Sequence, residues 1–324
     1  MVSREKYGVV LLNMGAPESR DGIEPYLFNL FSDPEIVNIP LGSIFRRFLA
    51  RRIAKKRAPL AAEKYDFIGG KSPLLEETKK QAKKLSECLN IPVSIAMRYS
   101  EPRADAALSA LSNEGVNKII ALPLYPQFSF STTRSSIKDI FAHKKDGIEI
   151  RTIESYYNDD AYISAMSALL ESALSNADDF LKTHILFAAH GIPERYTKRG
   201  DPYIGQVNET ARLIHKRLSP SMPYSLAFQS RVGPIKWHRP SLDEELENLL
   251  KSGVEQVILQ PLSFVSENLE TLYDLDIEFK QLSQRKGLKS FIRVKTPGDA
   301  DEFIRALAKI VQTAAAQSGE ERNV

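Results

Sequence analysis

A histidine ends an apolar segment of this chain, HILFAAH (184–190), and a turn follows at Gly191, Ile192 and Pro193. An imidazole has an unperturbed pKa of about 6.5, so it accepts protons near neutral pH, and its neutral ring binds divalent metals. His190 is therefore a candidate for proton transfer or metal binding. The structural alternative is a histidine that caps the segment by bonding to a neighbouring carbonyl group.

Three acidic residues recur at every fourth position of the segment 266–279, namely Glu270, Asp274 and Glu278. On a helix they would share one face. A neutral imidazole together with carboxylates suits borderline divalent metals such as Fe²⁺ or Zn²⁺. No second histidine or cysteine lies nearby, so such a site would bind a metal weakly and pass it on. The alternative is an ordinary solvated helix face.

The elements that must position these residues alternate between strands and helices. Helical spacing marks stretches such as 77–89 and 241–253. Apolar runs separated by helices indicate an α/β protein with parallel sheets covered on both faces. The runs that predict strands are 7–14, 93–99, 118–125, 148–153, 184–190, 224–230, 256–264 and 290–296. Four strands in each half predict two similar domains, 1–155 and 156–324, joined near 153–160.

The two halves also align with each other, which indicates a duplication. The segment 115–129 matches 253–267, and LLNMGAPE (11–18) matches the stretch that ends at Glu194. This alignment places Met14 opposite His190. The paired glycines are 100 residues apart in the first half and 62 in the second, so the first half carries about 38 extra residues between its first and third strands.

In open parallel sheets, ligands bind beyond the carboxyl ends of the strands. Met14, the Arg98–Tyr99 pair and Tyr125 end strands of the first half, whereas His190, Gln229 and the stretch 264–270 end strands of the second. Two domains that face each other would gather these side chains around one cleft.

Composition limits the function classes. The chain has 324 residues, 43% of them hydrophobic and 26% charged, and a net charge of +3, which makes no case for nucleic acid as a partner. The first residues lack the pattern of a signal peptide, and no run approaches a spanning helix. One cysteine, Cys88, excludes an internal disulfide and a site built from several thiolates of this chain. We therefore expect a cytoplasmic protein.

Several motifs together resemble one known family, the ferrochelatases. They include LLNMGAPE (11–18), LFSDP (30–34), IGGKSPL (68–74), RYSEP (98–102), LYPQFS (124–129), AHGIP (189–193), RGDPY (199–203), FQSRVGPIKW (228–237) and FVSENLETLYDLDIEF (264–279). The resemblance implies a chelatase-like fold of two Rossmann-like domains, each with a four-stranded parallel sheet. It also implies insertion of Fe²⁺ into protoporphyrin IX with release of two protons, the last step of haem biosynthesis.

The resemblance implies site residues as well. His190 matches the catalytic histidine and Glu270 its partner carboxylate, while Asp274 and Glu278 match an acidic path that completes the metal site. Met14, Arg98, Tyr99, Trp237 and Phe264 match residues that line the macrocycle, and we expect Tyr125, at a strand end, to join them. Many members have a histidine where this chain has Asn268 and an aspartate where it has Glu267.

The resemblance also bears on cofactors and substrate. An iron–sulfur cluster of the kind found in some relatives needs four cysteines, so we expect none, and no tightly bound cofactor, with Fe²⁺ as a substrate. Methionine at position 14 is typical of members that use protoporphyrin IX rather than coproporphyrin III. Two alternatives stay open: a chelatase that loads cobalt or nickel into another tetrapyrrole, and a haem or porphyrin carrier. A carrier would not need the acidic row.

The extra residues of the first half, near 26–70 and called the insertion below, contain a basic segment, SIFRRFLARRIAKKR (43–57). An imperfect apolar arc on this predicted helix comprises Ile44, Phe45, Phe48, Leu49 and Ile53. We expect a lip that receives the flat porphyrin and makes peripheral contact with an anionic membrane at the inner membrane surface. The alternative is a helix that faces the core and leaves its arginines in solvent.

Overall fold

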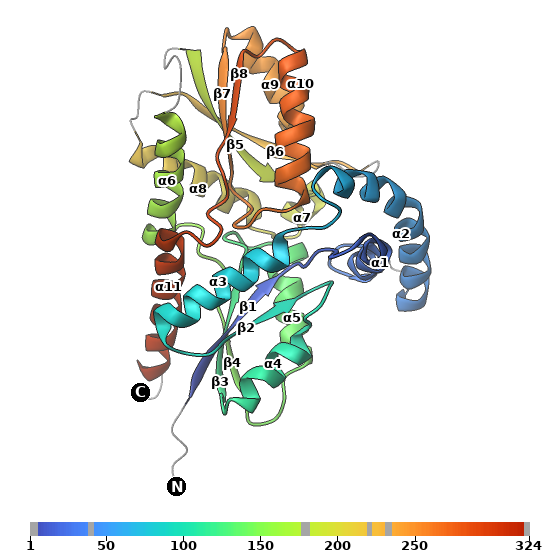
Figure 1. Cartoon of the computed structure of the whole chain (residues 1–324), viewed down its shortest axis with the longest axis vertical. Coiled ribbons are helices and arrows are strands. Elements are labelled where there is room, and N and C mark those ends of the chain that lie inside the picture. Colours follow the sequence, from blue (N-terminus) through green and yellow to red (C-terminus); the bar gives the residue numbers. More distant parts are fainter. Residues whose placement is uncertain (1–5, 38–41, 176–181, 219–221, 231–234, 321–324) are drawn as a thin grey trace. The chain divides into compact units, whose positions relative to one another are not determined.

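The computed structural model describes residues 6–37, 42–175, 182–218, 222–230 and 235–320, which form two compact units (Figure 1). The first unit comprises residues up to 155 together with the segment from 298 onward, and the second comprises 156–297. Each unit contains one four-stranded sheet in which all strands are parallel, so the α/β architecture predicted from the sequence is confirmed.

The sheet of the first unit has the strand order β2-β1-β3-β4. Its strands are β1 (Tyr7–Asn13), β2 (Val93–Met97), β3 (Lys118–Pro123) and β4 (Glu149–Thr152). Val10 and Leu12 on one face of β1 join a core with residues of α4 (Ala104–Asn113) and α5 (Ser135–Ala142). Because successive side chains of a strand point to opposite faces, Val9 and Leu11 are buried on the other side, where α3 (Leu74–Leu89) packs.

The second unit repeats this plan with the strand order β6-β5-β7-β8. Its strands are β5 (Thr183–His190), β6 (Tyr224–Gln229), β7 (Gln256–Pro261) and β8 (Ser290–Arg293). The apolar face of α9 (Leu242–Lys251) packs on β5 and β7, and α6 (Asp160–Leu174) and α8 (Tyr203–Arg217) contact the sheet as well. Ser241 caps α9 in a capping box with Glu244.

Strand registers support the internal alignment of the two halves. In the first sheet Leu12 pairs with Pro123, and in the second Ala188 pairs with Pro261. These are the same positions that the sequence alignment matches, so Met14 and His190 stand at equivalent strand ends. In both halves the third strand is followed by a helix with wide i→i+5 turns, η2 (Phe130–Arg134) and η4 (Glu270–Phe279).

The extra residues of the first half lie between β1 and α3. They form η1 (Arg20–Gly22), α1 (Ile23–Ser32) and α2 (Gly42–Phe67), while residues 38–41 of the insertion lie outside the described part. Helix α2 is longer than the predicted 43–57, and it packs on α1 along a seam that buries Ala50 and Ala54. Ile44 is 86% exposed and Phe48 is 57% exposed, so this end of α2 does not face the core.

The C-terminal helix α11 (Asp301–Glu320) belongs to the first unit, although the sequence favours the second domain for this segment. It packs beside α3 and over β3 (Figure 1). The Arg151 guanidinium donates a hydrogen bond to the carbonyl oxygen of Ala314 at 2.6 Å, and the Gln81 amide donates to the carbonyl oxygen of Gly298 at 2.9 Å. The chain thus returns to its first sheet after completing the second.

Phe303, on α11, tests this assignment because its side chain is fully buried. We expect Phe303→Ala to cost about 3–5 kcal/mol of stability, as for other large-to-small core changes. Amide hydrogen exchange should become faster in β3 and α3 but not in β7. The exposed Lys309 of the same helix offers the control Lys309→Ala, which should leave exchange unchanged. Faster exchange in β7 alone would contradict the assignment of α11.

Candidate active site

His190 is the last residue of β5, a central strand of the second sheet. Residues 183–189 of this strand are buried on both faces, and only His190 is partly exposed. Its backbone N–H donates to Ser263 Oγ at 3.1 Å, and the Tyr203 hydroxyl lies 2.5 Å from the same oxygen. Burial, as the largest cause, raises the pKa of the Tyr203 hydroxyl, which therefore stays protonated and available as a donor. The main chain at His190 is thus held by side chains of two other elements.

The imidazole of His190 pairs with the carboxylate of Glu270, the first residue of η4. Nδ1 lies 2.8 Å from Glu270 Oε2, and the Gln229 amide donates to the same oxygen at 3.0 Å. The alternative of a histidine bonded only to a backbone carbonyl therefore does not describe this ring. When Nδ1–H donates to the carboxylate, Nε2 of the neutral ring carries the lone pair that can take a proton or a metal.

Electrostatics favour the charged form of His190. Burial by itself lowers the pKa of the imidazole, but the charge and hydrogen bond of Glu270 and the charge of Asp274 outweigh it and raise the pKa above the usual value. The ring is therefore a better proton acceptor near neutral pH than a free histidine. Each proton it takes is stabilised by the carboxylate beside it.

The acidic row lies on η4, which has wide turns rather than the α-helix expected for 266–279, and α10 (Lys280–Arg285) continues from it. Wide i→i+5 turns are frequently found at functional sites. Residues four apart still lie on the same side of such a helix. Glu270 and Asp274 are partly buried and Glu278 is exposed, so the row leads from His190 to solvent.

Two residues for which the sequence predicted no structural role, Asn268 and Arg293, shape the start of η4. Asn268 Oδ1 accepts the backbone N–H of Glu270 at 2.8 Å and that of Thr271 at 3.3 Å, so Asn268 caps the helix. Arg293, at the end of β8, donates to Glu267 at 3.0 Å and, with two nitrogens, to Asp276 at 2.6 and 2.7 Å. The sequence shows that the segment 266–279 is rich in acidic residues. It does not show which basic residue pairs with them, because Arg293 is 17 and 26 residues away from its two partners.

Two aromatic side chains predicted for the site lie in this unit. The Phe264 ring meets the His190 ring edge to face, with 6.4 Å between centroids. Trp237 pairs through its backbone with Pro193, in the turn that follows His190. A side chain at Gly191 would come within 2.8 Å of the Gln229 carbonyl oxygen, so only glycine lets the turn pack this closely. Residues 231–234 of the motif 228–237 lie outside the described part.

The first unit holds the other predicted residues. Met14 follows β1 and is partly exposed, and its carbonyl oxygen accepts the N–H of Tyr99 at 3.0 Å. Tyr125 is partly exposed, and its hydroxyl lies 3.4 Å from Ser136 Oγ. Burial raises the pKa of the Tyr125 hydroxyl, which stays neutral.

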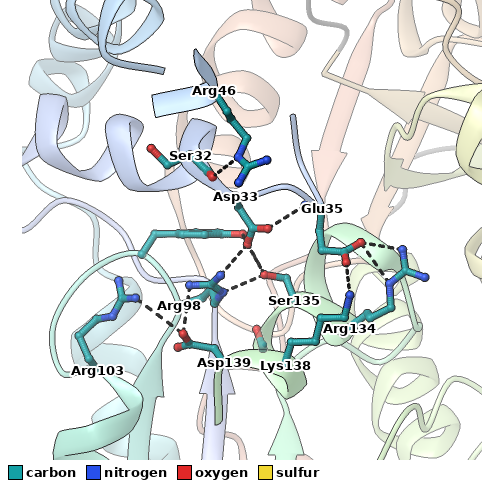
Figure 2. Close-up of polar contacts among 12 residues, drawn as sticks. Ser32, Asp33, Glu35, Arg46, Arg98, Arg103, Arg134, Ser135, Lys138 and Asp139 are labelled. Carbon is teal, nitrogen blue, oxygen red and sulfur yellow. Dashed lines mark hydrogen bonds and ion pairs between the residues drawn. The ribbon is translucent and has the colours of Figure 1, made fainter. Parts of the chain in front are cut away.

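Arg98 and Tyr99 are held inside an ionic network of the first unit (Figure 2). The Arg98 guanidinium donates to Asp33 at 2.8 Å and to Ser135 at 2.8 Å, and it lies 3.3 Å from Asp139. Tyr99 is 1% exposed, and its hydroxyl donates to Asp33 at 2.8 Å. We expected Tyr99 to line the substrate. In this structure its side chain is enclosed, and the Arg98 guanidinium lies 5.0 Å from the centre of its ring.

Few side chains of the described part of the chain come together as possible ligands of a metal ion. Among residues 6–37, 42–175, 182–218, 222–230 and 235–320, no group of three or more histidine, cysteine, aspartate or glutamate side chains is arranged to hold a metal ion. The pair of His190 and Glu270 supplies one nitrogen and one carboxylate, and Asp274 acts on His190 through its charge.

Comparisons with known proteins agree over nearly the whole chain. A family model described as Ferrochelatase matches residues 6–315. The ferrochelatase of Aquifex aeolicus (strain VF5) is 42% identical over 313 residues, which cover 95% of this chain and 99% of that protein. The ferrochelatase of Geobacter metallireducens is 42% identical over 316 residues, covering 96% and 99%. Ferrochelatase-2, chloroplastic, of Arabidopsis thaliana is 40% identical over 321 residues, covering 94% of this chain and 63% of that protein.

Solved structures support the fold. SirB from Bacillus subtilis with Fe³⁺ superposes with a TM-score of 0.61 at 12% identity, covering 97% of this chain and 98% of that one. CbiX, the terminal enzyme for biosynthesis of siroheme in denitrifying bacteria, gives a TM-score of 0.53 at 15% identity, covering 96% and 99%. Such low identities establish the chelatase-like fold alone.

The raised pKa of His190 leads to a prediction about its partner. We expect Glu270→Gln to lower the pKa of His190, measured by NMR titration of the imidazole proton resonances, because the largest favourable charge is removed. By linkage, the pair stabilises the fold fully below about pH 6.5, and this contribution is lost as the pH rises through the raised pKa. Glu278→Gln, at the exposed end of the row, is the control. An unchanged or higher pKa in Glu270→Gln would contradict the assignment.

Proposed function

Because this chain belongs to the ferrochelatase family, we propose that His190 and Glu270 are the pair with which it accepts the pyrrole protons of protoporphyrin IX. The protein inserts ferrous iron into a porphyrin and so makes protohaem. A free porphyrin carries two N–H protons in the hole that the metal must enter. Insertion therefore needs a proton acceptor, and the 2.8 Å contact between His190 and Glu270 is the observation that carries this proposal.

The pair suits repeated proton transfer. His190 Nε2 takes a proton from a pyrrole N–H, and Glu270 Oε2 stabilises the imidazolium ion that forms, as a carboxylate does for a catalytic histidine in other enzymes. Gln229 donates to the same carboxylate oxygen, which keeps Glu270 oriented while the charge on the ring changes. The rise in the His190 pKa supports this role.

The acidic row offers a route for Fe²⁺ and for the protons that the porphyrin releases. Glu270 and Asp274 lie partly buried, and Glu278 is exposed. Together with His190 they supply the nitrogen and oxygen ligands that suit Fe²⁺ as a passing substrate. Protons released from the porphyrin can leave along the same carboxylates. A group of ligands closed around the ion would oppose transfer to the macrocycle, so a site with few ligands fits a metal that has to be given up.

Each unit, taken by itself, offers side chains that we propose as contacts for the macrocycle. Phe264 and Trp237, close to His190, offer aromatic surface in the second unit, and the partly exposed Met14 and Tyr125 offer contact in the first. The methionine at position 14 supports protoporphyrin IX over coproporphyrin III. Arg98 remains a proposed substrate contact, while Tyr99 acts by supporting it.

The insertion supports a further part of the proposal, contact with an anionic membrane surface. Ile44 is 86% exposed, Phe45 44% and Phe48 57%, and the exposed Lys55 and Lys56 follow on the same helix. None of the described helices is long and apolar enough to cross a bilayer. An apolar tip with basic neighbours suits peripheral binding, to which each basic residue adds about 1 kcal/mol near an anionic surface.

The function is tested by mixing the protein anaerobically with protoporphyrin IX and Fe²⁺ and following the absorbance bands of the porphyrin. We expect multiple turnovers, and a lower kcat/KM for coproporphyrin III. His190→Ala and Glu270→Gln should each lose more than about 90% of the turnover, at least about 1.4 kcal/mol of barrier. Both should still bind porphyrin, because the aromatic contacts remain.

Glu302→Gln, an exposed position on α11 of the first unit, controls for loss of a carboxylate. If either site variant kept more than a tenth of the wild-type rate, its assigned role would be wrong. One-to-one binding of porphyrin without turnover by the wild-type protein would favour a carrier, and turnover only with cobalt or nickel would favour a different chelatase.

Membrane contact is tested by sedimentation with vesicles that contain anionic lipid. Arg46, Arg47 and Arg51 are poor choices for charge reversal, because their guanidinium groups contact α1 at Ser32 and Phe28. We expect Ile44→Ser with Phe48→Ser, and separately Lys55→Glu with Lys56→Glu, to weaken vesicle binding at least fivefold, about 1 kcal/mol. Salt should weaken binding of the wild-type protein. Unchanged binding in both double variants would remove the membrane proposal and leave the catalytic one intact.

A further inference from the structure

We propose that Asp33 is the positioning residue that anchors the insertion to the first sheet and thereby sets the affinity for porphyrin. Asp33 ends α1, and its carboxylate is 2% exposed. It lies on none of the elements that carry His190 or Glu270. The inference rests on the proposed function and on the expectation from the sequence that the insertion receives the porphyrin.

One carboxylate oxygen of Asp33 collects donors from two parts of the first unit (Figure 2). Oδ2 accepts from the Arg98 guanidinium at 2.8 Å and from the Tyr99 hydroxyl at 2.8 Å, both just after β2. It also accepts from the Ser135 hydroxyl, at the start of α5. Asp33 therefore joins the end of the insertion's first helix to a strand end and to the helix that follows the third strand.

The other oxygen of Asp33 shapes the chain that leads away from α1. Oδ1 accepts the backbone N–H of Glu35 at 2.8 Å, which turns the main chain directly after the helix. Glu35 in turn pairs with Arg134 at 2.6 Å and with Lys138 at 2.5 Å. The segment 33–35 is thus tied to η2 and α5 by two acidic residues, of which Asp33 is the more buried.

Each nitrogen of the Arg98 guanidinium has a partner in this network. Its Nη2 donates to Asp33, its Nε donates to Ser135, and its Nη1 lies 3.3 Å from Asp139. The Arg98 side chain is 18% exposed, and the carboxylates close to its guanidinium offset the cost of removing most of this charge from water. Loss of the Asp33 charge would leave Arg98 with Asp139 alone among these carboxylates, so the attraction between the insertion and β2 would weaken.

Asp33 lies directly after α1, and α2 follows it along the chain. The Arg46 guanidinium donates to the Ser32 carbonyl oxygen at 2.9 Å. The guanidinium groups of Arg47 and Arg51 lie 5.2 and 5.7 Å from the centre of the Phe28 ring, and Arg57 lies 5.5 Å from that of Phe31. These contacts join α2 to α1 rather than to the sheet. The position of the exposed apolar tip of α2 is therefore set through the end of α1.

The test uses Asp33→Asn in the full-length protein, because asparagine keeps the shape and loses the charge. We expect the KM for porphyrin to rise about tenfold while kcat stays within about threefold, a split that a loss of catalytic groups would not produce. Amide hydrogen exchange in α1 and α2 should become faster, and exchange in β5 should not change. Ser135→Ala, which removes one of the three donors to Oδ2, should change both readouts in the same direction by less.

Asp66→Asn is the matched control. Asp66 lies on α2 and is half exposed, and its ion pair with Arg20 at 2.7 Å is of the exposed kind that contributes little. The Asp66→Asn variant should keep the KM for porphyrin and the amide hydrogen exchange of α1 and α2 near their wild-type values. If Asp33→Asn left exchange in α1 and α2 unchanged, or lowered kcat as much as it raised KM, the anchoring role would be wrong. Amide hydrogen exchange is measured without any enzymatic turnover, so it tests the anchoring role of Asp33 even if iron insertion were disproved.

Discussion

The chemistry of the second unit depends on a single oxygen atom, Oε2 of Glu270. It accepts from His190, at the end of β5, and from Gln229, at the end of the neighbouring β6. Parallel strands end at the same edge of a sheet, so both donors reach one point, and the carboxylate approaches from η4. Around this atom the backbone is fixed by Ser263 and Tyr203 behind His190 and by Asn268 and Arg293 around the start of η4. The site is rigid because each group that touches it belongs to a different element.

The strand order of the first unit is equivalent to that of the second, but different side chains lie at the carboxyl ends of its strands. Arg98 occupies the position equivalent to Gln229, since Met97 pairs with Asn13 as Phe228 pairs with Ala189. Gln229 donates a hydrogen bond to the Glu270 carboxylate beside the His190 ring. At the equivalent position of the first unit, Arg98 forms an ion pair with Asp33, whose carboxylate is buried. The duplicated plan therefore carries the proposed catalytic pair at the edge of one sheet and the proposed anchor of the insertion at the equivalent edge of the other.

Much of this could be predicted from the sequence. Long apolar runs such as 184–190 predict buried parallel strands, and the four-residue spacing of Glu270, Asp274 and Glu278 predicts one acidic helix side. The wide turns of η4 could not be predicted, because they depend on how the helix start is capped and paired. The sequence predicted no role for Asp33, although it lies in the motif LFSDP, because the side chains that donate to its Oδ2 atom are more than 60 residues away along the chain. Helix α11 was assigned to the wrong half because an amphipathic helix shows which face is buried, and not against which sheet.

The contacts between α1 and α2 have a thermodynamic consequence. Cation–π contacts and a hydrogen bond join the two helices, while Ile44, Phe45 and Phe48 already face solvent in the folded state. Because these three side chains are already exposed, unfolding of the helix pair exposes little more of them, whereas Ala50, Ala54 and Tyr65 of α2, which are buried, become newly exposed. The heat-capacity change and the denaturant dependence of unfolding both scale with newly exposed area. The exposed tip of α2 therefore contributes little to either quantity, and calorimetry and denaturant titration of this protein report mainly on the residues that are buried in the folded state.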